Sequence, residues 1–250
     1  MTFFCLNFKC LNLIPAALLA PMMLLGCDDG HIDDPVHVDS SKYFTVHFVA
    51  TVTGLDDWDD SLMPVLAGYD GESQYSLIQK NITLTSTDHE LPDTLTLSRI
   101  PLTVTSVEVA VANVLRQRQA TIFAYAIPEG HDPDVPIVVN VGPLDVSRFG
   151  AVNAAVFQGL SCFRCHQGDE PPAGLSLVAD VARDNLVGVP SAKSPSQTLV
   201  VPGRADDSFL VKVITDGDDN VHYDHRPFFA GDDGTRLCDI IKAWVNNIDE

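Results

Sequence analysis

The segment SCFRCHQG, residues 161–168, decides how the C-terminal half of this 250-residue chain is interpreted. Two cysteines, Cys162 and Cys165, are separated by two residues, and His166 follows the second cysteine directly. Cysteines at this spacing are used to attach a haem covalently, to coordinate a metal ion or to close a small disulfide. The rest of the chain has to discriminate between these three chemistries.

Covalent haem attachment requires this order of residues. The two thiols add across the two vinyl groups of the porphyrin, and the adjacent histidine then lies under the iron as an axial ligand. This chemistry assigns Cys162 and Cys165 to attachment and His166 to the iron. The segment therefore predicts one covalently bound haem c.

Zinc coordination is the main alternative. Cys162, Cys165, His222 and His225 form a Cys-x₂-Cys…His-x₂-His set, whose chemistry suits tetrahedral zinc. Two residues between the histidines is short for that pattern, and zinc does not require a histidine directly after the second cysteine. A Cys162–Cys165 disulfide is the third possibility, although no strand–helix unit of the thioredoxin type precedes the pair.

The residues on both sides of the motif follow a helical period. The apolar stripe that leads into the motif consists of Phe149, Val152, Val156 and Leu160. A second stripe near the C-terminus consists of Leu237, Ile240, Ile241, Trp244 and Val245. The chain between them is rich in loops, with one short helix expected near Leu177–Leu186. We expect residues 143–250 to form a small, mostly α-helical domain.

Residues 43–142 show a period of two instead. From Phe44 to Val52 apolar residues alternate with polar ones, apart from Val49, as in a half-buried strand. Shorter runs of the same kind lie at 94–98, 107–112, 122–127 and 137–141, separated by glycine and proline. This pattern predicts an antiparallel β-sandwich of about seven strands. The expected fold class is therefore α+β by domain, an all-β sandwich followed by a mostly α domain.

The first 26 residues have the pattern of an export signal. The apolar run from Leu11 to Leu25 is broken by two prolines and is too short for a membrane-spanning helix of about 20 residues. It ends in Leu-Leu-Gly-Cys27, which resembles the lipobox of bacterial lipoproteins. That resemblance implies that Cys27 is acylated and anchors the protein to a membrane of the cell envelope, on the periplasmic face or the cell surface. Residues 27–42 are acidic and lack apolar periodicity, so we expect a flexible tether.

The surroundings of the motif resemble the c-type cytochrome domains of bacterial envelope proteins. Besides the motif, the resemblance rests on PAGLSL at 172–177, VPGRADDSFL at 201–210 and IKAWV at 241–245, and it covers about Phe149–Asn247. It implies that the first and last helices cross beside the haem, with Val156 and Trp244 at the crossing.

The same resemblance predicts a methionine before a proline, ahead of the last helix, as the distal iron ligand. This chain departs from the pattern, because the corresponding segment reads HYDHRP at 222–227 and arginine precedes the proline. His225, His222 or an open position are the remaining alternatives for the sixth ligand. Two histidine ligands would give a lower potential than histidine with methionine.

The charge of the chain restricts its partners. It has 34 acidic and 15 basic residues and a net charge of −19 at neutral pH. Such a chain repels phosphate backbones, so nucleic acid is a poor partner, whereas a basic redox protein suits it. The acidic clusters at 56–60 and 216–220 lack the late glutamate of a calcium loop and are expected to be solvated turns. Cys238 is expected to be a buried free thiol.

Electron transfer is the function that these observations favour. We expect an envelope-anchored lipoprotein that carries electrons one at a time, rather than an enzyme, because no acid–base pair or phosphate loop stands out. The alternative is a surface binding or structural lipoprotein whose C-terminal domain, with haem or zinc, is stabilising or sensing.

Overall fold

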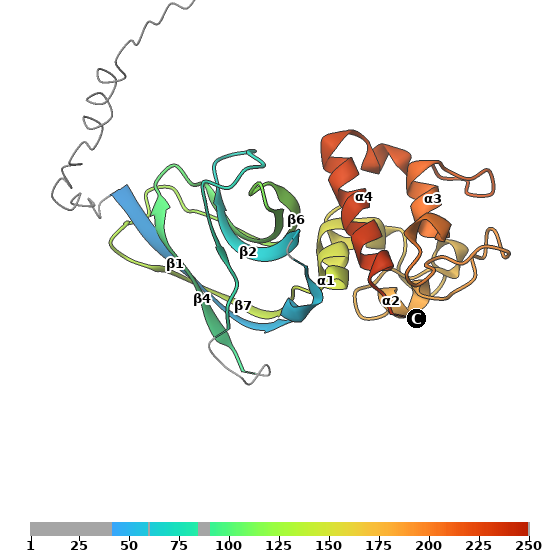
Figure 1. The fold of residues 1–250 in the computed structure, drawn as a ribbon, viewed down its shortest axis with the longest axis horizontal. Helices are drawn as coiled ribbons and strands as arrows, with labels where there is room; N and C mark the ends of the chain where they lie inside the picture. Colours follow the sequence, from blue (N-terminus) through green and yellow to red (C-terminus); the bar gives the residue numbers. More distant parts are fainter. Residues whose placement is uncertain (1–41, 60, 85–90, 250) are drawn as a thin grey trace, which may run out of the picture. The chain divides into compact units, whose positions relative to one another are not determined.

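The computed structural model describes residues 42–59, 61–84 and 91–249 (Figure 1). The predicted export signal, Cys27 and all of the predicted tether except Lys42 lie outside these residues. Among the described residues, no helix combines the length and the apolar character needed to cross a membrane.

The described part of the chain contains the predicted strand region followed by helices. The strands are β1 (Tyr43–Thr53), β2 (Leu62–Tyr69), β3 (Ile78–Asn81), β4 (Asp93–Pro101), β5 (Ser106–Asn113), β6 (Arg118–Ala126) and β7 (Ile137–Asp145). They form two sheets, with the strand orders β4–β1–β7 and β3–β2–β5–β6. Every second side chain of β1 from Phe44 to Val52 is buried, as the alternating pattern predicted. The α+β fold class is confirmed.

One strand pair differs from the purely antiparallel arrangement that we expected. β1 pairs antiparallel with β4 on one side but parallel with β7 on the other, while all pairs of the second sheet are antiparallel. A parallel pair requires a long connection, and here all the intervening strands separate the two partners. Sequence periodicity alone carries no signal for the direction of a neighbour.

The strands β2 and β3 were not identified in the sequence. β2 is buried on both faces after its first two residues, so apolar residues follow one another without the polar alternation of a half-buried strand. Leu66 faces the core between the sheets, whereas Val65, Ala67 and Tyr69 pack with Ala112 on the other face. Pro64 and Gly68 further weaken the signal, because both residues are depleted in strands.

The helical region contains more helix than the sequence predicted. Its elements are α1 (Arg148–Val152), the π-helical turn η3 (Asn153–Gln158), α2 (Ala182–Leu186), α3 (Phe209–Thr215) and α4 (Gly231–Asn246). The 3₁₀ turns η4 (Cys162–Arg164), η5 (Pro172–Gly174), η6 (Ala205–Asp207) and η7 (Arg226–Phe229) connect them. α2 is shorter than the helix expected near Leu177–Leu186, and α3 was not predicted.

Strands and helices share a buried interface. The described residues belong to one compact unit, and the hydrophobic cluster around α4 includes Val111 of β5 and Ala120 of β6. β7 continues through Pro143 to Asp145, and α1 begins at Arg148. The limits 43–142 and 143–250 of the two expected domains remain predictions.

The described part of the acidic cluster, residues 56–59, is not simply the solvated turn that the sequence predicted. The Trp58 indole N–H donates to the Val146 carbonyl at 2.5 Å, and the Arg148 guanidinium pairs with Asp57 at 3.6 Å and Asp59 at 3.3 Å. The backbone N–H of Arg148 also donates to Asp57 at 2.7 Å. These carboxylates neutralise a buried arginine at the start of α1, and we call this group of four residues, Asp57, Trp58, Asp59 and Arg148, the α1 clasp.

Candidate haem-binding site

The motif segment is positioned by the interrupted helix that precedes it. The N-cap of α1 is Ser147, whose hydroxyl accepts from the Gly150 N–H at 2.9 Å. The helix continues as η3, which buries Val156 and Phe157, and π-helical turns are common near functional sites. Ser161 then adopts a left-handed conformation with φ of 60°. This residue ends the helix and redirects the chain, so that the motif begins on a separate turn.

Both cysteines of the motif carry free thiols. They lie on η4 and at its end, where the backbone N–H groups of Cys165 and His166 donate to the Cys162 carbonyl at 3.2 and 3.1 Å. Cys165 is exposed, whereas Cys162 is half-buried and its burial raises the pKa of the thiol. The disulfide alternative is therefore not what the structure contains, and one short turn presents both thiols.

His166 is held in one tautomer by the chain itself. Its Nδ1 lies 3.0 Å from the Leu175 carbonyl oxygen, which can only accept, so Nδ1 carries the proton. The turn η5, with Ala173 at φ of 59°, brings Leu175 back to the histidine. The Leu177 N–H donates to the His166 carbonyl at 2.8 Å and closes this contact. Nε2 of His166 is consequently left with its lone pair for a metal ion.

His225, rather than His222, lies near His166. The ring centroids of His166 and His225 are 6.4 Å apart, and the rings are tilted by 39°. Nδ1 of His225 is buried and has no hydrogen-bond partner among the described residues. Burial, and next the neighbouring His166, lower the pKa of His225, which favours the neutral imidazole that binds metals. His222 is exposed.

The spacing of the two histidines fits one iron between them. A metal–imidazole bond is about 2.0 Å long and the ring centre lies about 1 Å further out, so opposed ligands have centroids about 6 Å apart. The observed 6.4 Å agrees with that value. Together with two free thiols on one turn, these residues fit a haem held through two thioether bonds and two axial histidines.

The zinc alternative fits less well. Among the residues that the structure describes, no group of three or more His, Cys, Asp or Glu side chains is placed to hold a metal ion. Cys162, Cys165, His222 and His225 are therefore not assembled into the tetrahedral set that zinc prefers. A haem iron needs only two side chains from the protein, because the porphyrin supplies the other four ligands.

Arg226, at the position where the resemblance predicts methionine, has a different role. Its guanidinium pairs with Asp224 at 2.8 Å and donates to the Asp216 carbonyl at 3.3 Å. Tyr223 packs edge-on against the His225 ring, with centroids 5.1 Å apart. Arg226 thus ties its loop back to the end of α3, and this loop carries His225.

The first and last helices pack together, as the resemblance implied. Val156 and Trp244 are both buried, and the Phe149 and Trp244 rings lie 5.0 Å apart. Cys238 is buried and free, as predicted.

The sequence did not point to the Leu175 carbonyl, because a backbone acceptor has no side-chain signature. The PAGL segment at 172–175 is the available signal, because it belongs to the stretches that carry the resemblance.

Comparison with known proteins identifies a cytochrome c-like segment in this region. Residues 162–222 match the model of the family described as Planctomycete cytochrome C. The match begins at Cys162 and ends before His225, and it lies wholly C-terminal to β7. A search of curated proteins found no match. The C-terminal region is therefore cytochrome c-like, which implies haem binding and electron transfer.

Proposed function

We propose that this protein is an envelope-anchored lipoprotein that binds one covalent haem c and transfers single electrons. The proximity of His166 and His225, whose ring centroids lie 6.4 Å apart, carries the proposal, since this spacing suits two imidazoles bound to one metal ion. The match of residues 162–222 to a cytochrome family supports it independently.

Each residue of the site has a distinct role in the proposal. Cys162 and Cys165 would hold the haem covalently, and His166 would bind its iron through Nε2. The hydrogen bond from Nδ1 to the Leu175 carbonyl fixes the orientation of this imidazole. His225 would supply the second imidazole to the iron. A haem held in this way supplies a reversible one-electron couple.

A carrier fits this site better than a catalyst. With histidines at both axial positions, no coordination position is left for a substrate. Two imidazoles also lower the potential relative to an imidazole and a thioether, because the thioether favours the reduced iron. Met63, on β2, donates no ligand here: its sulfur lies 3.5 Å from the Asn81 amide nitrogen.

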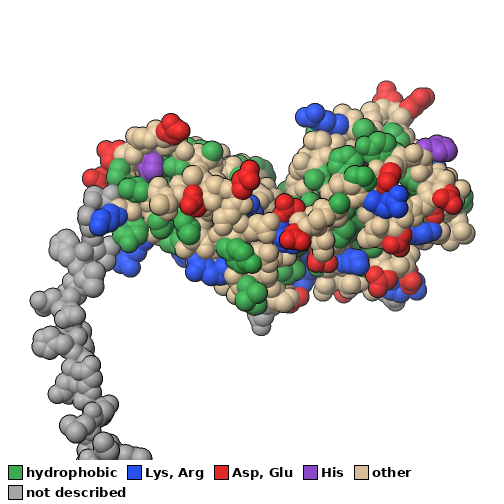
Figure 2. Space-filling view, turned by 90° about the horizontal axis from the view of Figure 1, so that it is seen from above, with side chains coloured by type: hydrophobic (Ala, Val, Ile, Leu, Met, Phe, Trp, Pro, Cys, Tyr) green, Lys and Arg blue, Asp and Glu red, His purple; other side chains and the backbone are tan. Residues whose placement is uncertain are grey.

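The partner and the location rest on charge and on the N-terminal sequence. Acidic side chains occur over both the strand and the helical parts of the face shown in Figure 2, in keeping with the net charge of −19. A basic redox protein suits this surface. Acylation of Cys27 would hold the protein at a membrane of the cell envelope, on the periplasmic face or the cell surface. The strand region would then act as a spacer or docking module.

Maturation of the chain tests the proposal directly. The chain is expressed in cells that attach haem c, and the product is analysed by intact mass and by a pyridine haemochrome spectrum. We expect the mass of one added haem, and visible bands that change reversibly with dithionite and ferricyanide. The Cys162→Ala/Cys165→Ala variant should stay colourless. A wild-type product with the bare polypeptide mass would refute the proposal.

The alternative function has its own signature. A haem-loaded protein that exchanges no electrons with small redox mediators would instead be a binding or sensing lipoprotein.

A further inference from the structure

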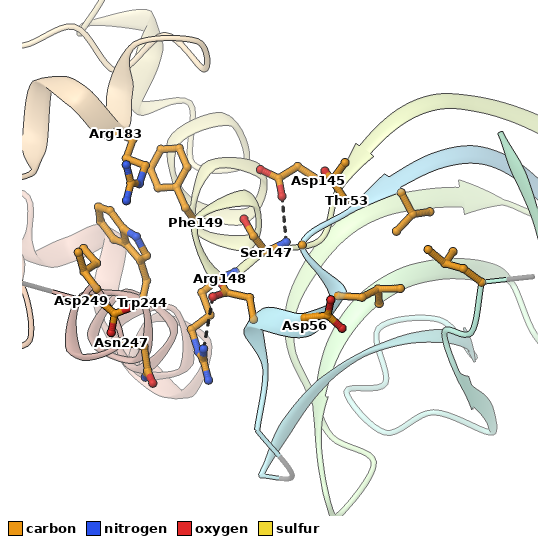
Figure 3. Close-up of a pocket in the computed structure, with 16 residues that line it drawn as sticks. Thr53, Asp56, Asp145, Ser147, Arg148, Phe149, Arg183, Trp244, Asn247 and Asp249 are labelled. Atoms are coloured by element: carbon orange, nitrogen blue, oxygen red, sulfur yellow. Dashed lines mark hydrogen bonds and ion pairs between the residues drawn. The ribbon is translucent and has the colours of Figure 1, made fainter. Parts of the chain in front are cut away.

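A second site lies apart from the haem ligands. A cavity of about 970 Å³ opens where the ends of β1 and β7 meet the helices (Figure 3). Its strand side includes Asp56 and Asp145, and its helical side includes Arg183 of α2. Neither the motif cysteines nor His166 and His225 line it. Its volume lies at the upper end of the range of about 300–1,000 Å³ that small-molecule sites occupy.

The charged groups of the cavity are not neutralised by one another. Arg148 at its floor is paired within the α1 clasp. Arg183, by contrast, has no ion pair among the described residues, and neither Asp56, Asp145 nor Asp249 has a basic partner there. Asp145 accepts only the Ser147 N–H, at 2.9 Å. Among the described residues, one guanidinium and three carboxylates without an ion pair therefore border the same space.

An aromatic surface lies between these charges. The rings of Phe149 and Trp244 are tilted by 51° with centroids 5.0 Å apart, and Phe149 is half-buried beside Arg183 in Figure 3. Aromatic faces accept both aliphatic chains and cations. A ligand with an apolar stem and charged ends would match this arrangement.

We propose that the cavity binds a cationic α-amino acid, a molecule with one carboxylate and two positive groups. The guanidinium of Arg183 pairs with the carboxylate, since arginine binds carboxylates through two parallel hydrogen bonds. The two positive groups pair with the carboxylates of Asp145, Asp56 and Asp249, and the aliphatic stem lies along Phe149. Three acidic groups against one basic group select a ligand of net positive charge.

Other ligand classes fit the cavity less well. A phosphate or a dicarboxylate would pair with Arg183 but would face three carboxylates of like charge. A bare divalent cation lacks its ligands, because no three metal-binding side chains are gathered among the described residues. A simple diamine has no carboxylate to pair with Arg183. Its two positive charges would also lie near the unpaired guanidinium.

The test compares molecules that differ by one group. The purified, haem-loaded mature chain is titrated with L-lysine, with cadaverine, which lacks only the carboxylate, and with L-leucine and L-glutamate. Binding is followed by calorimetry and by the rise in melting temperature that a ligand of the folded state causes. We expect L-lysine to bind about tenfold more tightly than cadaverine or L-leucine, and L-glutamate to bind most weakly.

Variants assign the carboxylate to Arg183. Arg183→Gln should reduce the affinity for L-lysine about tenfold and should not weaken cadaverine binding, since cadaverine has no carboxylate for Arg183 to bind. Arg183→Lys should reduce the affinity for L-lysine by less, because lysine keeps the positive charge but lacks the two parallel donors of the guanidinium. Asp145→Asn should weaken the binding of both L-lysine and cadaverine. Arg204→Gln, which removes an exposed arginine outside the cavity, should change neither.

Three results would overturn the proposal. They are the absence of binding by L-lysine, equal affinities for L-lysine and cadaverine in the wild type, and unchanged L-lysine binding in Arg183→Gln. The haem spectrum of each variant serves as the control for folding, since the haem ligands do not line the cavity.

Discussion

The α1 clasp allows a quantitative test of why the acidic cluster exists. The Arg148 side chain is only 9 % exposed, whereas those of Asp57 and Asp59 are 41 % and 59 % exposed. Asp57→Asn/Asp59→Asn keeps the shapes but leaves the buried guanidinium without a countercharge. Removing one partner of a fully buried pair costs about 3–5 kcal/mol. Because the two carboxylates are partly solvated, we expect a loss of about 2 kcal/mol in the free energy of unfolding.

Removing the arginine instead of the two carboxylates should lower the free energy of unfolding by less. In the native protein the Arg148 guanidinium lies 5.4 Å from the centre of the Trp58 ring. Arg148→Met removes the charge but keeps an unbranched side chain against this ring. The two carboxylates then return to water, and we expect a loss of about 1 kcal/mol.

Urea unfolding at neutral pH measures both variants. Tryptophan fluorescence is a suitable probe, because the two tryptophans, Trp58 and Trp244, lie in the clasp and on α4. Asp206→Asn, on an exposed carboxylate 3.7 Å from Lys242, is a matched control that should change the stability by less than about 0.5 kcal/mol. The interpretation of the clasp is wrong if Arg148→Met lowers the free energy of unfolding as much as the double variant does. It is also wrong if the double variant is as stable as the Asp206→Asn control.

Three further predictions concern the haem region. His225→Ala should open the sixth position, so that added imidazole or carbon monoxide changes the visible spectrum, whereas His222→Ala should keep the wild-type spectrum; equal spectra for both variants would remove His225 as the ligand. Gly159→Ala should lower the free energy of unfolding by about 2 kcal/mol, and reduce haem loading, because its Cβ would overlap the Ala155 carbonyl; wild-type urea unfolding would contradict this. Prolonged EDTA treatment should leave the melting temperature unchanged, whereas a structural zinc would be lost and the temperature would fall.

Much of the fold could be predicted from local patterns. β1 was predicted because one face is buried and the other is not, so the alternation of side chains along a strand appears directly in the sequence. β2 was missed because both of its faces are buried. The stripe from Phe149 to Leu160 predicted a helix, but not the π-helical turn η3, since a shift in hydrogen bonding leaves little trace in the apolar period.

The candidate site also has one part that the local sequence predicts and one part that it leaves open. The order Cys162-x-x-Cys165-His166 carries its chemistry within five residues, so the sequence alone predicts a haem attachment site there, and this stays a prediction. The sequence does not discriminate between His222 and His225, because both suit the iron chemically and they are separated by only two residues. In the structure, the loop tied by Asp224 and Arg226 carries His225, whose ring centroid lies 6.4 Å from that of His166.

Sequence by itself determined the elements whose cause is local: the alternating strands, the helical stripes and the cysteine–histidine motif. Tertiary structure alone decided the parallel pairing of β1 with β7, the clasp between Asp57 and Arg148, and the cavity that places Arg183 opposite Asp145. The physical reason is distance along the chain. These contacts join residues dozens of positions apart, and their energies depend on burial and counter-charges that only the folded chain creates.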